Sequence, residues 1–181
     1  MADLTTLANA KAWIPVTGTA DDALLTRLIS AASATAEQYI GRNVISANYT
    51  DKRDGNGKAF LYLANAPCTA ISTLTVDGVP AAPQTIVGGN GYVFDANYIT
   101  LVGAVFTQGV KNVTVSYTAG YASPPLDIEQ AVIDLVAFKY NARKWIGQSS
   151  KVLQGETINF LHDVPPDIYR ALLQYRRTVQ P

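Results

Sequence analysis

The chain has 181 residues, enough for one domain or for a domain with a substantial insertion. A single cysteine and a single histidine exclude a disulfide framework and any metal cluster built from several of these residues. Lysine plus arginine and aspartate plus glutamate both number 14, and the resulting net charge of zero argues against a dedicated nucleic-acid binder. Charged residues make up only 15% of the chain, which is typical either of a surface that a partner covers or of a monomer poor in charge.

Residues 1–44 have the pattern of helices. Leu4–Trp13 is predicted to form a short helix. Thr19, which has an acidic residue three positions later, is typical of a helix N-cap, and apolar residues at helical spacing follow it as far as Ile40. Gly41 then stands where a glycine commonly ends a helix, so the sequence predicts a second, longer helix.

Residues 45–121 have the pattern of strands and turns. Turn signals recur, and between them lie six runs that we predict as strands: Val44–Thr50, Ala59–Leu63, Ile71–Val76, Tyr92–Phe94, Tyr98–Val102 and Val113–Tyr117. In the last run, apolar and polar residues alternate with the period of a half-buried strand. Gly55–Lys58 and Asp77-Gly78 are predicted as turns. Together these signals indicate a small antiparallel sandwich or barrel-like sheet.

Residues 126–181 again have the pattern of helices. The sequence predicts one helix over Leu126–Lys144, which follows two prolines, and a last helix over Asp167–Thr178. A polar loop is predicted between them. The fold class is therefore predicted as α+β. We expect a helical bundle domain built from both chain ends, residues 1–44 and 122–181, with an inserted antiparallel β domain at residues 45–121.

No reactive side chain has a catalytic motif around it. His162 lacks an accompanying serine or cysteine motif and is predicted to be a loop or packing residue, and Cys68 is predicted to be a buried structural thiol. Gly55–Lys58 lacks the spacing of a phosphate loop, and Asp51 and Asp54 do not fit a calcium loop. We therefore predict no catalysis, no metal and no cofactor.

Membrane and secretion signals are also missing from the sequence. No run approaches the roughly 20 apolar residues of a membrane span. Met1–Leu4 has no basic segment followed by an apolar core. The sequence therefore predicts a protein that is made in a cytoplasm and has no membrane partner.

The predicted helix Leu126–Lys144 carries apolar residues on nearly all of its sides, so it must be buried on several of them. The stretch Ala31–Ala36 contains only Ala, Ser and Thr and would let another helix approach closely. Because a small helical domain offers limited burial, we predict that some of it comes from a neighbouring subunit. The predicted interface residues are Ala31, Ala34, Val132, Leu135, Val136 and Phe138.

Several separated segments resemble the head–tail connector (adaptor) proteins of long-tailed bacteriophages and related prophages or gene-transfer particles. They are Leu4–Ile14, Asp21–Ile40, Leu61–Gly78, Val113–Tyr121 with the prolines after it, and Pro166–Arg177. The resemblance implies a structural protein of the virion neck. The resemblance also implies a homo-oligomeric ring, usually dodecameric, beneath the portal protein, which would extend the DNA channel and offer a platform to the tail or a stopper protein. Many family members are nearly all helical, so the large β segment is a departure.

The resemblance assigns the C-terminal end of the chain to the portal. An apolar stripe on the last helix can pack on the subunit's own helices, and the arginines beyond it are suited to pairing with carboxylates. The predicted portal-docking residues are Arg170, Tyr175, Arg176, Arg177 and Val179. The arginines could instead simply solvate the helix and interact with its dipole.

The polar loop before the last helix could face the channel lumen or the tail, or be an ordinary exposed loop. Its candidate residues are Gln148, Ser149, Ser150, Gln154 and Asn159. A translocating duplex needs a wall without tight phosphate contacts, so we expect DNA to pass without sequence-specific binding.

A different hypothesis is a ligand-binding β module, for example one that binds carbohydrate, on a helical base. Exposed aromatic residues such as Tyr92, Tyr98 or Tyr121 would serve such a module. An enzyme is disfavoured because no paired acid and base are found in the sequence.

Overall fold

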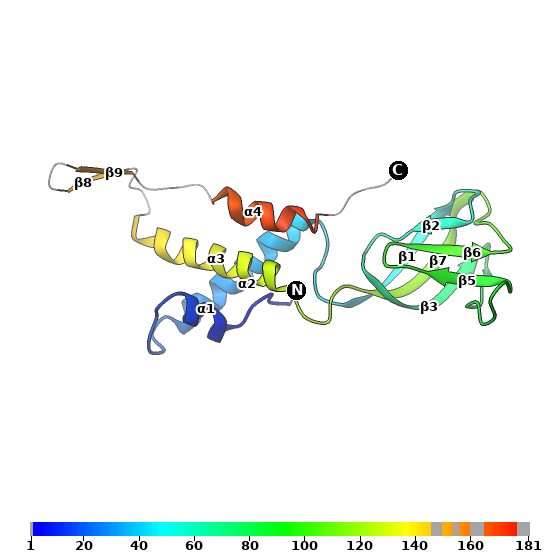
Figure 1. Cartoon of the computed structure of the whole chain (residues 1–181), viewed down its shortest axis with the longest axis horizontal. Helices are drawn as coiled ribbons and strands as arrows, with labels where there is room; N and C mark the ends of the chain where they lie inside the picture. Colours follow the sequence, from blue (N-terminus) through cyan, green and yellow to red (C-terminus); the bar gives the residue numbers. More distant parts are fainter. Residues whose placement is uncertain (1, 146–149, 154–155, 160–164, 177–181) are drawn as a thin grey trace. The chain divides into compact units, whose positions relative to one another are not determined.

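The structure is a computed structural model that describes residues 2–145, 150–153, 156–159 and 165–176. Contacts divide the chain into two compact units, which we call the helical unit (within residues 1–42 and 124–178) and the β unit (residues 43–123). Figure 1 shows helices toward both ends of the chain and the strands of two antiparallel sheets between them. The α+β fold class is confirmed.

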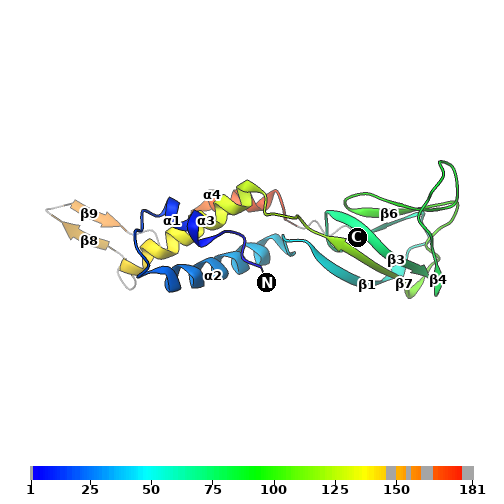
Figure 2. The same cartoon turned by 90° about the horizontal axis from the view of Figure 1, so that it is seen from below.

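The helical unit is a small bundle of α1 (Leu7–Trp13), α2 (Asp22–Ile40), α3 (Leu126–Ala142) and α4 (Pro166–Leu173). The helices α2 and α3 lie side by side (Figure 2), and α1 and α4 each pack against both of them. A 3₁₀ turn, Arg143–Trp145, extends α3. The fully buried large side chains of this bundle are Leu4, Leu25, Ile40, Ile128, Leu135 and Leu172.

The start of α2 differs from the prediction and its end agrees with it. The N-cap residue is Asp21, not Thr19, and its side chain makes no capping hydrogen bond. Instead, the Asp21 carboxylate accepts a hydrogen bond from the Tyr140 hydroxyl of α3, which fixes this carboxylate away from the helix end. Gly41 has a φ of 80° and ends the helix in the left-handed conformation, as predicted.

The last helix is shorter than predicted. It ends at Leu173, whereas the sequence predicts helix as far as Thr178. The backbone N–H groups of Tyr175 and Arg176 bond to carbonyls three residues back, on Leu172 and Leu173, which is the pattern of a tightened 3₁₀-type turn and not of a continuing α-helix.

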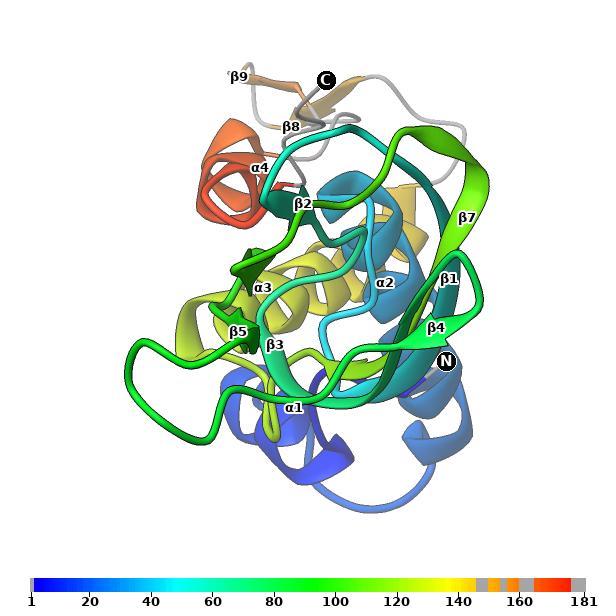
Figure 3. The ribbon, with the colours of Figure 1, turned by 90° about the vertical axis from the view of Figure 1, so that its right-hand side faces the viewer.

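The β unit consists of two antiparallel sheets (Figure 1, Figure 3). The first, in the order β1-β7-β3-β4, is formed by Ala47–Gly55, Gly109–Ala119, Cys68–Val76 and Val79–Pro80. The second, in the order β2-β6-β5, is formed by Phe60–Tyr62, Tyr98–Val102 and Gly91–Phe94.

Side chains from both sheets form one core, so the β unit is a sandwich, one of the two predicted arrangements. Val113, Val115 and Tyr117 on β7 are at most 1% exposed, and the residues between them are half-buried, which confirms the alternation read from the sequence. They belong to one buried cluster with Ile99 and Leu101 of the other sheet.

The two predicted turns have different outcomes. Asp77-Gly78 is a hairpin turn between β3 and β4, and both residues have positive φ, 53° and 78°, as a type I′ turn requires. Gly55–Lys58 is not a hairpin turn, because β1 pairs with β7 and β2 pairs with β6. The segment crosses from one sheet to the other, and the Asn56 side chain holds it by accepting from the Lys58 N–H and donating to the Phe60 carbonyl.

The predicted polar loop between α3 and α4 contains an antiparallel hairpin. Strands β8 (Ser150–Leu153) and β9 (Glu156–Asn159) pair with Ser150 opposite Asn159, so these two candidate residues lie in strands and not in a loop. Gln148, Ser149 and Gln154 lie outside the described residues.

The Tyr117 hydroxyl joins three segments of the β unit. It donates a hydrogen bond to the Asp51 carboxylate of β1 at 2.7 Å and accepts one from the Asn65 backbone N–H at 3.1 Å. Burial, and next the hydrogen bond to Asp51, raise the pKa of Tyr117 to about 12. The hydroxyl therefore stays protonated in the folded chain at pH values where an unfolded tyrosine ionises.

Tyr117→Phe is expected to lower the free energy of unfolding at pH 7 by about 1–3 kcal/mol, because its half-buried partners Asp51 and Asn65 each lose a hydrogen bond. Between pH 10.0 and about 12, Tyr117 ionises in the unfolded wild-type chain but stays protonated in the folded one, so the wild type loses stability as the pH rises. Tyr117→Phe lacks this loss. Urea denaturation at pH 7 and at alkaline pH measures both effects. Tyr49→Phe is the matched control. An equal pH slope in wild type and Tyr117→Phe would contradict the assignment.

Candidate assembly surfaces

Three predicted interface residues lie in the core of the helical unit. Val132, Leu135 and Val136 are 0%, 1% and 0% exposed. The helices α1, α2 and α4 of the same chain all pack against α3 and cover these side chains. The prediction that a neighbouring subunit covers these three residues is therefore corrected. Packing within one chain already buries them and leaves them no surface for a neighbouring copy.

The other predicted interface residues retain accessible surface. Ala31 is exposed, and Ala34 and Phe138 are half-buried. Within the small-residue stretch, the buried Ser33 hydroxyl accepts a hydrogen bond from the Leu4 backbone N–H at 2.9 Å. The small side chains thus accommodate the N-terminal segment of the same chain, and the exposed part of this stretch remains a predicted contact.

A shallow hollow lies where the end of α1 meets the end of α3. It has a volume of about 430 Å³ and is lined by residues that include Trp13, Val16, Tyr140 and Lys144. Trp13 is 58% exposed, which is unusual for so large an apolar side chain. The lining of the hollow mixes apolar side chains with the polar groups of Tyr140, Asn141 and Lys144.

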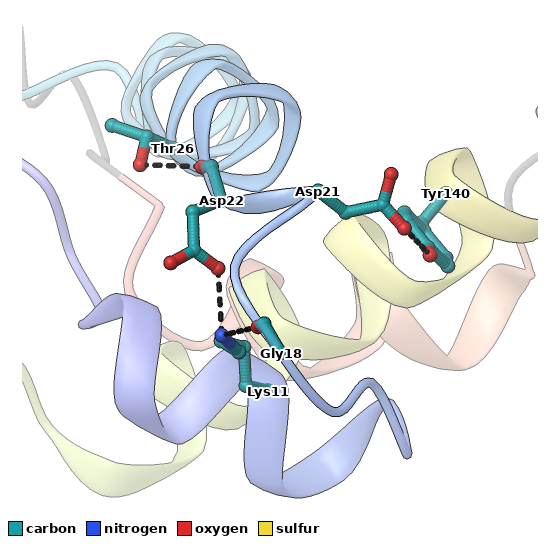
Figure 4. Close-up of polar contacts among 6 residues, drawn as sticks. All are labelled: Lys11, Gly18, Asp21, Asp22, Thr26 and Tyr140. Carbon is teal, nitrogen blue, oxygen red and sulfur yellow. Dashed lines mark hydrogen bonds and ion pairs between the residues drawn. The ribbon is translucent and has the colours of Figure 1, made fainter.

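Polar contacts fasten the α1–α2 connection to the bundle (Figure 4). The Lys11 ammonium donates to the Asp22 carboxylate at 2.6 Å and to the Gly18 carbonyl. The Tyr140 hydroxyl donates to Asp21, and the Arg143 guanidinium lies 3.5 Å from the centre of the Tyr140 ring. These contacts of Lys11, Asp21 and Asp22 hold the start of α2 in place.

The residues predicted to dock on the portal make contacts within the helical unit where the structure describes them. The Tyr175 hydroxyl donates to the two Asp127 carboxylate oxygens at 2.9 and 2.8 Å, and the Arg176 guanidinium lies 5.8 Å from the Tyr39 ring centre. Arg170 is exposed and pairs with Asp167 on its own helix at 3.1 Å. Arg177 and Val179 lie outside the described residues.

Of the two reactive residues singled out in the sequence, the structure describes only Cys68. Cys68 is buried, as predicted, and burial raises the pKa of its thiol. His162 lies outside the described residues. Among the residues that the structure describes, no group of three or more His, Cys, Asp or Glu side chains could hold a metal ion, and no helix is long and apolar enough to cross a membrane.

The aromatic residues proposed for a ligand-binding β module have different environments. Tyr92 is only 7% exposed and belongs to the sandwich core, so its predicted exposure is wrong. Tyr121 is half-buried and lies in the segment that leaves the β unit, where its backbone pairs with Val44 and Ser46. Tyr98 is 36% exposed. The three side chains therefore do not form one binding platform.

An exposed row of aromatic side chains covers the outer face of the β2-β6-β5 sheet. We call Phe60, Tyr62 and Tyr98 the aromatic row; they are 38%, 36% and 36% exposed. The Phe60 and Tyr62 rings lie 5.8 Å apart and the Tyr62 and Tyr98 rings 6.0 Å apart, both edge to face. The Lys58 ammonium lies 5.5 Å from the Phe60 ring, and the Asp95 carboxylate raises the pKa of Tyr98.

Two of the comparisons with known proteins gave matches: a family model shows the family of the chain, and solved structures show its fold. The model of the head completion protein family matches residues 3–178. None of the curated proteins matches the chain. The solved structures that share its fold include two described as the neck of a gene transfer agent (GTA) particle, one empty and one native, and one described as the virion of a native GTA particle.

These structures are similar over almost the whole chain. The empty neck, computed with C6 symmetry, contains a chain 21% identical with a TM-score of 0.62, and the alignment covers 100% of this chain and 95% of that one. The native virion chain is 23% identical with a TM-score of 0.61, covering 97% and 90%. The native neck, computed with C12 symmetry, gives 21% identity and a TM-score of 0.61 over 97% and 90%.

Proposed function

Because the chain belongs to the head completion protein family, we propose that it is a structural connector at the head–tail junction of a phage or phage-like particle. The observation that carries the proposal is the family match over residues 3–178, which includes both units. The likeness to chains of GTA necks and virions supports the same role. The protein acts without catalysis, is made in the host bacterial cytoplasm and ends in the virion.

In this proposal, copies form a dodecameric ring beneath the portal protein. A closed ring of more than two copies needs head-to-tail contacts, in which two different surfaces of the chain meet. The exposed part of α2 at Ala31 and Ala34, together with Phe138, forms one surface of the lateral contact. Assembly on an existing portal ring raises the effective concentration of the copies, so weak lateral contacts suffice.

The proposed ring extends the DNA channel and offers its far side to a tail or stopper protein. The zero net charge supports passage of the duplex without tight phosphate contacts. The segment between α3 and α4, which carries the candidates from Gln148 to Asn159, faces the lumen or the tail in this arrangement.

Cosedimentation of the purified full chain with DNA-filled, portal-containing capsids tests the connector function. Saturable binding at about one ring for each capsid is the expected result, since a capsid has one portal vertex. Binding at many sites on the shell, or no binding, would contradict the proposal.

The C-terminal end is the proposed contact with the portal. Deletion of residues 177–181 keeps the Tyr175–Asp127 hydrogen bonds, so the fold is expected to be unchanged by circular dichroism. Capture by the capsids is expected to fall about tenfold or more, equivalent to the loss of about 1.4 kcal/mol of binding energy. Arg27→Ala, at an exposed arginine on α2, is the matched control. Undiminished capture of the truncated chain would refute the docking role.

A further inference from the structure

The aromatic row has opposite charges at its two ends. The Lys58 ammonium lies at the Phe60 end, 5.5 Å from the ring. Asp95 lies at the other end, where its backbone N–H donates to the Tyr98 carbonyl at 2.9 Å and its carboxylate raises the pKa of Tyr98. No salt bridge of the described residues includes either charge. The order along the surface is therefore a cation, three aromatic rings and an anion.

The strand pairing explains this order. In β2, Phe60 and Tyr62 flank the buried Leu61 and point outward, and Tyr62 lies opposite Tyr98 of β6. Val93 of β5, 41% exposed, widens the same face. Contiguous exposed apolar surface of this kind is characteristic of a protein contact.

The ring geometry indicates which kind of partner fits. The interplanar angles of 79° and 71° turn neighbouring rings edge to face, so the row offers no flat, coplanar platform for a planar ligand. Its end charges require a partner that presents an anion and a cation in the opposite order. The row itself has this arrangement when it is rotated by half a turn.

We propose that the outer face of the β2-β6-β5 sheet docks on the same face of a second copy of this chain, around a two-fold axis near Tyr62. In this arrangement Lys58 of each copy meets Asp95 of the other, and the aromatic rows cover one another. An isologous contact uses the same patch on both copies, which is what a patch with opposite charges at its ends permits. The contact goes beyond the proposed connector function: it pairs free copies in solution, whereas a ring needs head-to-tail contacts.

Analytical ultracentrifugation of the full chain at low salt tests the contact, over concentrations from about 1 to 100 μM. The wild type is expected to associate reversibly to dimers. Lys58→Asp or Asp95→Lys alone puts like charges together and is expected to weaken dimerisation about tenfold or more, and the combined variant is expected to restore it. Lys52→Asp, at an exposed lysine on β1 of the other sheet, is the matched control and leaves dimerisation unchanged.

A wild type that is monomeric over this range, or a combined variant no better than the single ones, would overturn the proposal. Because Asp95→Lys also removes the carboxylate beside Tyr98, Tyr62→Ser serves as a second variant that tests the face without changing charge. Circular dichroism checks that each variant is folded. Capsid cosedimentation of the same variants is a separate measurement, so failure of the dimer contact and failure of the connector function are distinguishable.

Discussion

Leu135→Ala is expected to lower the free energy of unfolding by about 2–5 kcal/mol. Leu135 is 1% exposed in the single chain, between helices that pack on α3 from several directions. Removing its side chain leaves a cavity that the bundle can close only in part, and this adds to the lost burial of apolar surface. Urea denaturation followed by tryptophan fluorescence measures the loss, since both tryptophans, Trp13 and Trp145, belong to the helical unit.

The protein concentration decides between core and interface. Substitution of a core residue destabilises the monomer at every protein concentration, whereas substitution of an interface residue changes stability only at concentrations where copies associate. Ala23→Ser is the matched control, because Ala23 is exposed on α2, lies outside the proposed contact, and its substitution is expected to change stability by less than about 0.5 kcal/mol. If Leu135→Ala lowers the free energy of unfolding only at high protein concentration, Leu135 lies at a subunit interface and not in the core.

The α3 helix shows that a sequence can predict burial but not whether the same chain or a neighbouring copy provides it. Its apolar residues on nearly all sides require burial on several sides, and the structure has that burial. The sequence does not say which chain supplies the covering helices. Here α1, α2 and α4 of the same chain supply them, from segments that lie before and after the β unit in the sequence.

Local signals predicted most of the β unit. Alternation identified β7, and the Asp77-Gly78 dipeptide identified a hairpin whose two positive φ angles suit these residues. Strand pairing was not predictable in the same way. The glycine-rich segment Gly55–Lys58 has the composition of a hairpin turn, yet it joins two sheets, since the long-range partners of β1 and β2 decide the pairing.

The aromatic row illustrates the same limit for a functional surface. Phe60 and Tyr62 alternate around Leu61, so the sequence alone indicates that they share a face of one strand. Tyr98 joins them only because β6 pairs with β2 in a register that puts it opposite Tyr62. The charges at the two ends, Lys58 and Asp95, become part of one surface through that pairing.

Gly120 lies at a crowded point where the chain leaves the β unit. Its φ of 116° is a conformation that residues with side chains rarely adopt. A Cβ atom there would lie 2.7 Å from the Ser46 nitrogen and 2.8 Å from the Ile45 carbonyl, and both are backbone atoms. The neighbouring Tyr121 pairs with this same segment, through hydrogen bonds of 2.9 Å to Val44 and from Ser46. The atoms nearest to that Cβ position therefore belong to backbone, which cannot move aside as a flexible side chain can.

Gly120→Ala is expected to lower the free energy of unfolding by about 3–4 kcal/mol, because strain at the positive φ adds to displacement of the facing backbone. Gly57→Ala is the matched control: Gly57 also has a positive φ, 71°, but a Cβ there meets nothing within 4 Å, so strain alone costs about 1–2 kcal/mol. Chemical denaturation measures both losses, and amide hydrogen exchange at Ser46 and Tyr121 is expected to rise only in Gly120→Ala. Equal losses for the two variants would show that the conformation, and not the close approach of Ile45 and Ser46, requires glycine at this position.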